Sequence, residues 1–250
     1  MQIKEQREYW DKMADAGIDA AVVDRNDTLG YKNRYIIELR TAVLLRELVL
    51  NRAHRVLDFG CGTGNLSRAL TRYGLEPVGV DISHKLLMAG MQVAERSPWH
   101  AVRYDGRRLP FAATSFDAVT TYVVLNYLVD DAHLTELLLE FYRILKPGGI
   151  LLAAEQVTRV ARLSADSSKL QRPPPAFGEL FEKAGFEIES QRTFRFGHFP
   201  LLYLIRYGCV PKSSWRTIAR LESWCGRIWP QPLWDYADRL FVVRRPRTAS

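Results

Sequence analysis

Three glycines set two residues apart form the first group in this sequence that could do chemistry. Gly60, Gly62 and Gly64 follow Asp58 in the pattern D-x-G-x-G-x-G. Glycine lets the backbone take positive φ or come within contact distance of a ligand, and a helix that begins after such a loop offers unpaired N–H groups. The loop is therefore suited to holding a polar ligand against bare backbone.

Two carboxylates further along could complete a nucleoside site. Asp81 closes the apolar run that begins at Glu76, and an acid at the carboxyl end of a second strand can accept hydrogen bonds from both ribose hydroxyls. Asp105 could accept from an exocyclic adenine amine, and the neighbouring Gly106 leaves room for a flat ring. A dinucleotide fingerprint does not fit, because Asn65 stands where its third glycine belongs. A structural turn followed by strand-end acids is the alternative interpretation.

The elements that must position these residues alternate between strand and helix. Strands are expected at 55–59, 76–83, 101–104, 115–125 and 150–154, and helices at 65–70, 85–95 and 131–145, with Ser83 as the N-cap of the second helix. Lys146-Pro-Gly-Gly149 is expected to end the third helix and reverse the chain. Such alternation predicts a mostly parallel sheet covered on both faces by helices.

The two ends of the chain are predicted to add helices to this core. Segments 5–14 and 35–48 have helical patterns, and Tyr9, Trp10 and Arg34 could contact a ligand or simply pack on the sheet. We expect 158–172 to be polar and mobile, a helix at 176–184, and final strands at 186–196 and 240–244. Between the final strands lies an insertion of about forty residues that holds Trp215, Trp224, Trp229 and Trp234.

A helix predicted over 213–228 within this insertion has two differently composed faces. One face carries Trp215, Ile218, Leu221, Trp224, Cys225 and Ile228, and another carries Arg216, Arg220 and Arg227. The helix could be a lid that packs its apolar face on the sheet and leaves the arginines in solvent. Alternatively, the arginines could face an anionic substrate or a membrane surface.

Composition limits the remaining possibilities. The chain has 250 residues, of which 47% are hydrophobic, and this predicts one large α/β domain. The first thirty residues hold no long apolar run, so we expect neither a signal peptide nor a membrane span, and a cytoplasmic location. The three cysteines form no metal-ligand cluster and no disulfide framework, so we expect reduced thiols and no metal.

The net charge of +7 is concentrated near the carboxyl terminus. Residues 197–250 hold nine Lys or Arg against three acids, a difference of +6. Such a region is typical either of a protein with an anionic partner or of a solvated basic surface.

The motifs together resemble those of the class I S-adenosylmethionine-dependent methyltransferases, in the small-molecule type 11 branch. The resemblance rests on the glycine loop, on Asp81, on Asp105-Gly-Arg-Arg-Leu-Pro-Phe111, on Phe116-Asp117 and on Tyr142-Arg-Ile-Leu-Lys-Pro-Gly-Gly-Ile-Leu151. Five motifs fall in the family's order between Val56 and Glu155. The resemblance therefore covers the cofactor-binding core and becomes weak beyond it.

The resemblance implies an α/β fold: a Rossmann-like, doubly wound, seven-stranded sheet, mostly parallel with an antiparallel last strand, plus N-terminal helices and a helical lid inserted before the last strand. It implies one methyltransferase domain over 1–250, with N-terminal helices at 1–52, a cofactor-binding core at 53–155 and a lid or substrate insertion at 197–238. The cofactor implied is S-adenosyl-L-methionine, which leaves as S-adenosyl-L-homocysteine. The residues assigned to it are Asp58, Gly60, Cys61, Gly62, Gly64, Asp81, Ile82, Asp105, Gly106 and Tyr122.

The predicted reaction is methyl transfer to a small molecule, with O-methylation of a hydroxyl in a sugar, lipid precursor or secondary metabolite as the leading case. Positioning and desolvation supply most of the acceleration, and a base is needed only where the acceptor must lose a proton. The family places the acceptor near Tyr122, Asn126 and Tyr127, and we assign Tyr122 and Asn126, together with His198, to the catalytic site. Among five histidines, including His133 at the start of a helix, we favour His198 as the base; catalysis without a single essential base is the alternative.

Two other functions stay open. A tRNA or other nucleic-acid methyltransferase would explain the basic carboxyl-terminal region, but the chain has Thr121-Tyr-Val-Val where amino-methylating nucleic-acid enzymes carry Asn/Asp-Pro-Pro-Tyr/Phe, so nucleic acid is disfavoured as a partner. A catalytically silent protein that binds S-adenosylmethionine and regulates a partner is the other. The tryptophans of the insertion favour an aromatic or apolar acceptor. Its arginines favour an anionic acceptor or a contact with a membrane surface. No oligomeric state is predicted.

Overall fold

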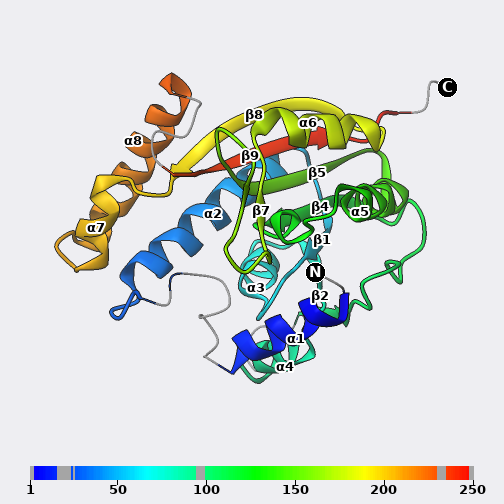
Figure 1. The fold of residues 1–250 in the computed structure, drawn as a ribbon, viewed down its shortest axis with the longest axis horizontal. Coiled ribbons are helices and arrows are strands. Elements are labelled where there is room, and N and C mark those ends of the chain that lie inside the picture. The colour runs from blue at the N-terminus through cyan, green and yellow to red at the C-terminus, as the bar shows by residue number, and fades with distance from the viewer. Residues whose placement is uncertain (1–2, 16–23, 25, 94–98, 230–234, 248–250) are drawn as a thin grey trace.

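The chain folds around one central sheet (Figure 1), and the structure, a computed structural model, describes residues 3–15, 24, 26–93, 99–229 and 235–247. The helices are α1 (Ile3–Ala14), α2 (Tyr31–Leu50), α3 (Asn65–Arg72), α4 (His84–Val93), α5 (Asp131–Ile144), α6 (Pro174–Lys183), α7 (Pro200–Arg206) and α8 (Trp215–Ile228), with 3₁₀ turns η2 (Leu125–Tyr127) and η3 (Lys212–Ser214). The sheet contains β1 (Arg55–Phe59), β2 (Glu76–Asp81), β3 (His100–Arg103), β4 (Phe116–Tyr122), β5 (Leu145–Val157), β8 (Glu187–Phe196) and β9 (Ala237–Arg244).

The strands lie in the order β3-β2-β1-β4-β5-β9-β8. Strands β3, β2, β1, β4 and β5 pair in parallel, whereas β9 is antiparallel to both of its neighbours. The predicted seven-stranded, doubly wound sheet with an antiparallel last strand is confirmed. The order reverses between β1 and β4, which is the place where sheets of this kind bind ligands beyond the carboxyl ends of their strands.

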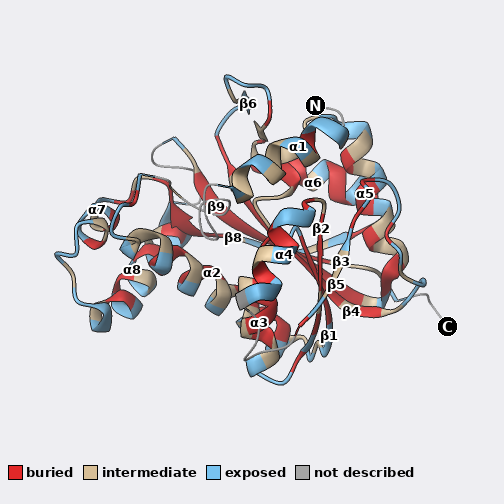
Figure 2. Ribbon diagram, turned by 90° about the horizontal axis from the view of Figure 1, so that it is seen from below, coloured by how far each residue is buried: buried red, intermediate tan, exposed pale blue. Residues whose placement is uncertain are grey.

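The central strands are buried on both faces, as parallel strands covered by two helical layers must be. Val56 and Leu57 of β1, Val119 of β4 and Leu152 of β5 are completely buried. Helices α2 and α3 contact each other in one layer, and α5 and α6 contact each other in the other (Figure 2). The edge of the sheet where β1, β2 and β4 end is therefore held rigidly between two packed layers.

Residues 158–172 contain a short hairpin, which the sequence did not predict. β6 (Arg162–Leu163) pairs with β7 (Leu170–Gln171), and the buried side chain of Arg172 fastens the base of the hairpin. Its Nη2 donates to the Leu128 carbonyl at 2.8 Å and forms an ion pair with Asp131 at 2.6 Å. These partners lie more than forty residues away in sequence, so the local polar composition could not reveal them.

β5 begins at Leu145, five residues earlier than predicted. Leu145 pairs with Phe116 and Ile150 pairs with Ala118, so residues 146–149 bulge out of the ladder instead of forming a separate turn. Gly148 takes φ +80° there. The helix predicted to follow the prolines includes two of them: Pro174 and Pro175 open α6, where the first-turn N–H groups need no partner.

The insertion between β8 and β9 forms an arm of α7, η3 and α8 at one end of the sheet (Figure 1). α8 packs on β8 through Trp215, Ile218, Glu222 and Gly226, which are buried. A Cβ at Gly226 would lie 2.4 Å from the Thr193 carbonyl oxygen, so only glycine permits this approach. Leu221, Trp224 and Ile228 remain exposed, and the prediction that the whole apolar face packs inward is wrong.

Among the residues placed by the structure, no helix is long and apolar enough to cross a membrane. The three cysteines are free, with Cys61 buried. Trp234 and Glu95 lie outside the described residues.

Candidate functional site

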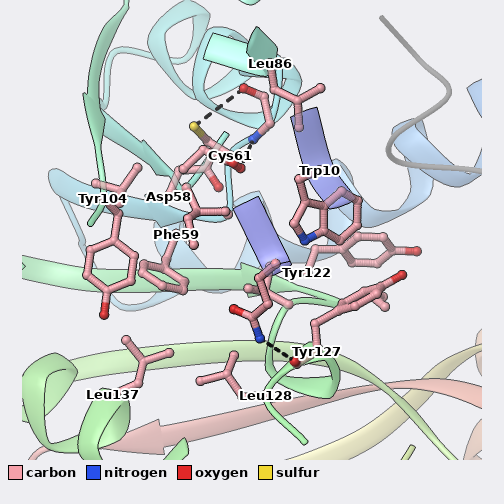
Figure 3. A pocket seen from close by; sticks show the side chains of 18 of the residues that line it. Trp10, Asp58, Phe59, Cys61, Leu86, Tyr104, Tyr122, Tyr127, Leu128 and Leu137 are labelled. Carbon is pink, nitrogen blue, oxygen red and sulfur yellow. Dashed lines mark hydrogen bonds between the residues drawn. The ribbon is translucent and has the colours of Figure 1, made fainter. Parts of the chain in front are cut away.

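A pocket opens at the carboxyl ends of β1, β2 and β4, the reversal point of the sheet (Figure 3). Its lining comes from the ends of these strands and the loops after them, from the helices α1 to α5, and from the loop after β3. The residues are Gln6, Trp10, Arg40, Asp58, Phe59, Gly60, Cys61, Gly62, Leu66, Val80, Asp81, Ile82, Leu86, Tyr104, Gly106, Tyr122, Val123, Val124, Tyr127, Leu128, His133 and Leu137. Eight of the residues predicted from the sequence therefore meet in one place: Asp58, Gly60, Cys61, Gly62, Asp81, Ile82, Gly106 and Tyr122.

The glycine loop is held against β2 by its own backbone. The N–H groups of Gly60 and Cys61 both donate to the Val80 carbonyl, at 2.7 and 3.0 Å. Gly60 and Gly62 take φ of +72° and +55°, a region that other residues seldom adopt. The loop consequently presents backbone, with no bulky side chain, to the pocket.

Gly64 has a different role from the one that the sequence predicted. It does not line the pocket; it precedes α3 with φ +74°, and a Cβ there would lie 2.5 Å from the indole ring of Trp99. Glycine at this position allows the loop to pack on Trp99. Its contribution to the site is to fix the start of α3.

Asp81 is the best-positioned acceptor in the pocket. Its Oδ2 accepts from the Gly62 N–H and its Oδ1 from the Ser83 N–H, both at 2.8 Å. The residue is only 8% exposed, and this burial raises the pKa of the carboxyl to about 6. Each carboxylate oxygen has a second acceptor position, so the group can still receive hydroxyl donors from a ligand.

Asp58 and Arg40 place opposite charges in the same pocket. Asp58 Oδ2 accepts from the Ser67 hydroxyl at 2.6 Å, and burial raises the pKa of this carboxyl, opposed by the nearby guanidinium of Arg40. Arg40 reaches in from α2, with its guanidinium carbon 4.7 Å from the ring centroid of Tyr122. A carboxylate and a guanidinium in the same pocket, Asp58 and Arg40, suit a zwitterion. Arg40 was not predicted; Arg34, named from the same helix, is exposed and does not line the pocket.

Tyr122 contributes its ring to the pocket while its hydroxyl is engaged elsewhere. The hydroxyl donates to Asp238 Oδ2 at 2.9 Å, and Asp238 is in turn paired with Arg195 at 2.6 Å. Burial, followed by the negative charge of Asp238, raises the pKa of Tyr122. The hydroxyl therefore cannot act as a base at neutral pH, and the ring is the part that a ligand meets.

The loop after β4 is shaped by a buried acid that the sequence analysis missed. Glu155 of β5 accepts from the Thr121 hydroxyl at 3.0 Å and from the N–H groups of Val124, Leu125 and Asn126 at 3.1, 3.2 and 3.4 Å. Burial raises its pKa to about 7. A lone acid in an otherwise apolar strand was the available signal. Glu155 thus fixes the backbone that carries Val123 and Val124 into the pocket.

Asn126 also serves this loop. It is completely buried, its side-chain amide donates to the Gln156 carbonyl at 3.0 Å, and it does not line the pocket. The structure therefore places this predicted catalytic residue beneath the site, where it joins η2 to β5.

Helix α1 covers the pocket from above. Gln6 Nε2 donates to the Tyr127 carbonyl at 2.8 Å, and the rings of Trp10 and Tyr127 meet edge to face with centroids 4.8 Å apart. Asp11 accepts from the Ser83 hydroxyl at 2.6 Å, which ties α1 to the start of α4. Figure 3 shows Trp10 beside Tyr127 over the pocket. A ligand beneath α1 would be shielded from water on that side.

Two further predicted residues lie elsewhere. Asp105 is exposed and accepts from the Arg107 N–H at 2.8 Å, so only its neighbour Gly106 reaches the pocket. His198 lies before α7, bonded through Nδ1 to the Tyr203 hydroxyl at 2.8 Å and 3.2 Å from Asp235. It does not line the pocket, whereas His133 of α5 does.

No described residue of the arm formed by α7, η3 and α8 lines this pocket, so the structure does not place that insertion as a lid over it. Within the described ranges, no group of three His, Cys, Asp or Glu side chains could hold a metal ion.

The sequence and the fold are similar to those of known methyltransferases. A family model described as "Methyltransferase domain" matches residues 57–153. The demethylmenaquinone methyltransferase of Staphylococcus haemolyticus is 32% identical over 162 residues, which are 61% of this chain and 66% of that protein. The chain thus spans slightly less than two thirds of the length of this relative.

Two solved structures share the architecture. An S-adenosylmethionine-dependent methyltransferase from Leishmania major aligns with a TM-score of 0.66 at 13% identity, over 96% of this chain and 82% of that one. Phosphoethanolamine N-methyltransferase 2 of Haemonchus contortus, solved with S-adenosyl-L-methionine, aligns with a TM-score of 0.56 at 19% identity, over 78% of this chain and 49% of that one. At these identities the likeness concerns the fold.

Proposed function

The chain carries a methyltransferase domain of the class I S-adenosylmethionine-dependent family, and from this premise we propose that it methylates a hydroxyl of a small, aromatic or apolar acceptor. The observation that supports the proposal is one pocket in which the buried carboxylate of Asp81, a bare glycine loop and aromatic side chains meet. The acceptor's chemistry and the atom methylated are the proposed parts.

The donor set of the pocket fits S-adenosylmethionine. Asp81, held by two backbone N–H groups, is suited to accept from the ribose hydroxyls. Asp58 and Arg40 match the ammonium and carboxylate of the amino-acid part, and Gly60 and Gly62 let it approach the backbone. When bound, this cofactor supplies a methyl group activated by a positively charged sulfur.

The residues on the other side of the pocket support an aromatic or apolar acceptor. Trp10, Tyr122, Tyr127 and Leu128 line it, and α1 excludes water from above. In water-poor surroundings, correct placement of the acceptor oxygen supplies most of the acceleration. We include demethylmenaquinone, named in the relative's description, among the acceptors to be tested.

The proton of a hydroxyl acceptor requires a base or a path to solvent. We assign this part to His133 in place of His198, because His133 lines the pocket and His198 is bonded to Tyr203 outside it. Replacing each histidine with asparagine and measuring kcat would separate them. His133→Asn should lower kcat at least tenfold, whereas His198→Asn should leave it unchanged. The opposite pattern would refute the assignment.

The test of the proposed function is transfer of a labelled methyl group from S-adenosylmethionine to a panel of acceptors. The panel contains hydroxylated aromatic compounds, demethylmenaquinone, a sugar and total tRNA, and mass spectrometry locates the new methyl. Label on a hydroxyl oxygen of an aromatic acceptor supports the proposal. Label on a carbon atom would show that the methylated atom is not the proposed oxygen, and label in tRNA would show that the acceptor is a nucleic acid. Cofactor binding without methyl transfer would favour the regulatory alternative.

A further inference from the structure

The outward side of α8 carries a stripe of large apolar side chains. Leu221, Trp224 and Ile228 follow one another at spacings of three and four, so they lie on the same side of the helix. They are 44%, 55% and 47% exposed, and the adjoining Trp229 is 52% exposed. Three such residues on one side of a helix, with a fourth at its C-terminal end, are more than the scattered apolar exposure that is usual on soluble proteins.

Three arginines lie beside this stripe. Arg216, Arg220 and Arg227 are exposed, and with 3.6 residues per turn they occupy the neighbouring sector of the helix surface, about a quarter turn away. None of the three forms an ion pair with another residue that the structure describes. The outer surface of α8 therefore combines an apolar stripe with unneutralised positive charge.

The opposite side of α8 anchors the helix and keeps this surface outward. Glu222 accepts from the Tyr35 hydroxyl at 3.0 Å and from the Phe196 N–H at 2.7 Å. Trp215 meets Tyr35 edge to face with ring centroids 5.9 Å apart. Because Gly226 also fits closely against β8, rotation of α8 to bury its outer stripe would break all of these contacts.

We propose that the outer surface of α8, defined by Leu221, Trp224, Ile228 and the three arginines, docks on an anionic lipid surface. Apolar side chains of an interfacial helix enter the boundary between headgroups and acyl chains, tryptophan favours that depth, and arginines bind the acidic headgroups. The charge of this surface is complementary, since Arg216, Arg220 and Arg227 are exposed and form no ion pair with another described residue.

The same surface is less suited to two other occupants. Across a two-fold interface with a second copy, the three arginines would face like charges, which is unfavourable. For RNA, successive bases stack on several aromatic rings, and in the helical stripe only Trp224 offers one. A lipid surface can take up the apolar stripe and bind the three arginines at the same time.

Vesicle co-sedimentation of the full chain tests the proposal. We expect the protein to sediment with vesicles of phosphatidylcholine and phosphatidylglycerol at 3:1 and to bind at least tenfold less to phosphatidylcholine alone. Leu221→Ser with Trp224→Ser, and separately Arg216→Gln with Arg220→Gln and Arg227→Gln, should each lower binding at least tenfold. Leu139→Ser, which removes an exposed leucine from α5, is the matched control and should bind like the parent protein.

Circular dichroism and thermal unfolding of each variant show whether the fold is retained. Equal sedimentation with neutral and acidic vesicles, or variants that bind like the parent protein, would overturn the proposal. The proposal would also be overturned if vesicles bound none of the proteins and the α8 substitutions instead abolished self-association or tRNA binding. The outcome does not depend on methyl transfer, because no described residue of α8 lines the pocket.

Discussion

Binding of the cofactor should become weaker as the pH falls below about 6, because Asp81 must be ionised to accept from two hydroxyls. Burial raises the pKa of this carboxyl to about 6 in the free protein. Hydroxyl donors favour the charged form, so the pKa is lower in the complex and binding at low pH expels a proton. Affinity is therefore fully present above the free-protein pKa and declines below it.

The size of the effect follows from the fraction ionised. With a pKa of about 6, roughly one carboxyl in eleven is ionised at pH 5, so affinity should be about tenfold lower at pH 5 than at pH 8, or about 1.4 kcal/mol. At pH 8, Asp81→Asn should weaken binding by about 1–3 kcal/mol through lost charge-assisted hydrogen bonds. The variant should also bind almost independently of pH between 5 and 8.

Calorimetric titration with S-adenosylhomocysteine at several pH values measures both effects. Repeating the titration at pH 5 in buffers of different ionisation enthalpy counts the proton released, which should be close to one. Glu136→Gln, an exposed carboxyl on α5, is the matched control and should keep the parent pH profile. A parent profile that is flat from pH 5 to 8, or one that Asp81→Asn leaves unchanged, would refute the reasoning.

Three further predictions concern stability and the predicted base. Gly64→Ala should lower the free energy of unfolding by about 2 kcal/mol or more in chemical denaturation, because the new Cβ would meet the Trp99 ring. Gly74→Ala is the control: Gly74 has a similar φ but open space around it, so the loss should be only about 1 kcal/mol. Equal losses in the two variants would contradict this reasoning. Burial raises the pKa of Glu222 to about 7 from 4.5, so the folded protein holds this proton more tightly than the unfolded chain does. The parent's free energy of unfolding should therefore fall as the pH rises from about 5 to 8. Glu222→Gln should reduce that slope, and an unchanged slope would contradict the prediction. His198→Asn should retain the parent methyl-transfer rate, and a loss above tenfold in a folded variant would restore that residue as the base.

The parts of the fold that the sequence predicted correctly depend on local patterns. The glycine loop, Asp81 and the alternation of strands and helices are each encoded within a few residues, and the order of the sheet follows from the family's motifs. Eight of the residues assigned to the cofactor therefore meet in the pocket. Asp105 is an exception, because its side chain accepts a hydrogen bond from the Arg107 N–H and does not line the pocket.

The features that the sequence did not reveal depend on contacts between distant segments. The hairpin at 158–172 depends on Arg172 reaching Leu128 and Asp131, and α8 buries Glu222 because Tyr35 and the Phe196 backbone lie opposite it. Helical periodicity assigned an inward face from hydrophobicity alone, which could not anticipate a buried acid. His198 was chosen for its chemistry, and only the three-dimensional structure shows that His133 reaches the pocket instead.

The position of β9 has a consequence for how the protein is made. This strand lies between β5 and β8, yet it follows both of them in the sequence. During synthesis, β5 must wait with one edge unpaired until residues 237–244 have left the ribosome, and β8 has no partner in the sheet before then. An unpaired edge of a buried, apolar strand is a site of aggregation. Nascent chains that stall before residue 237 should therefore depend on chaperones far more than the finished protein does.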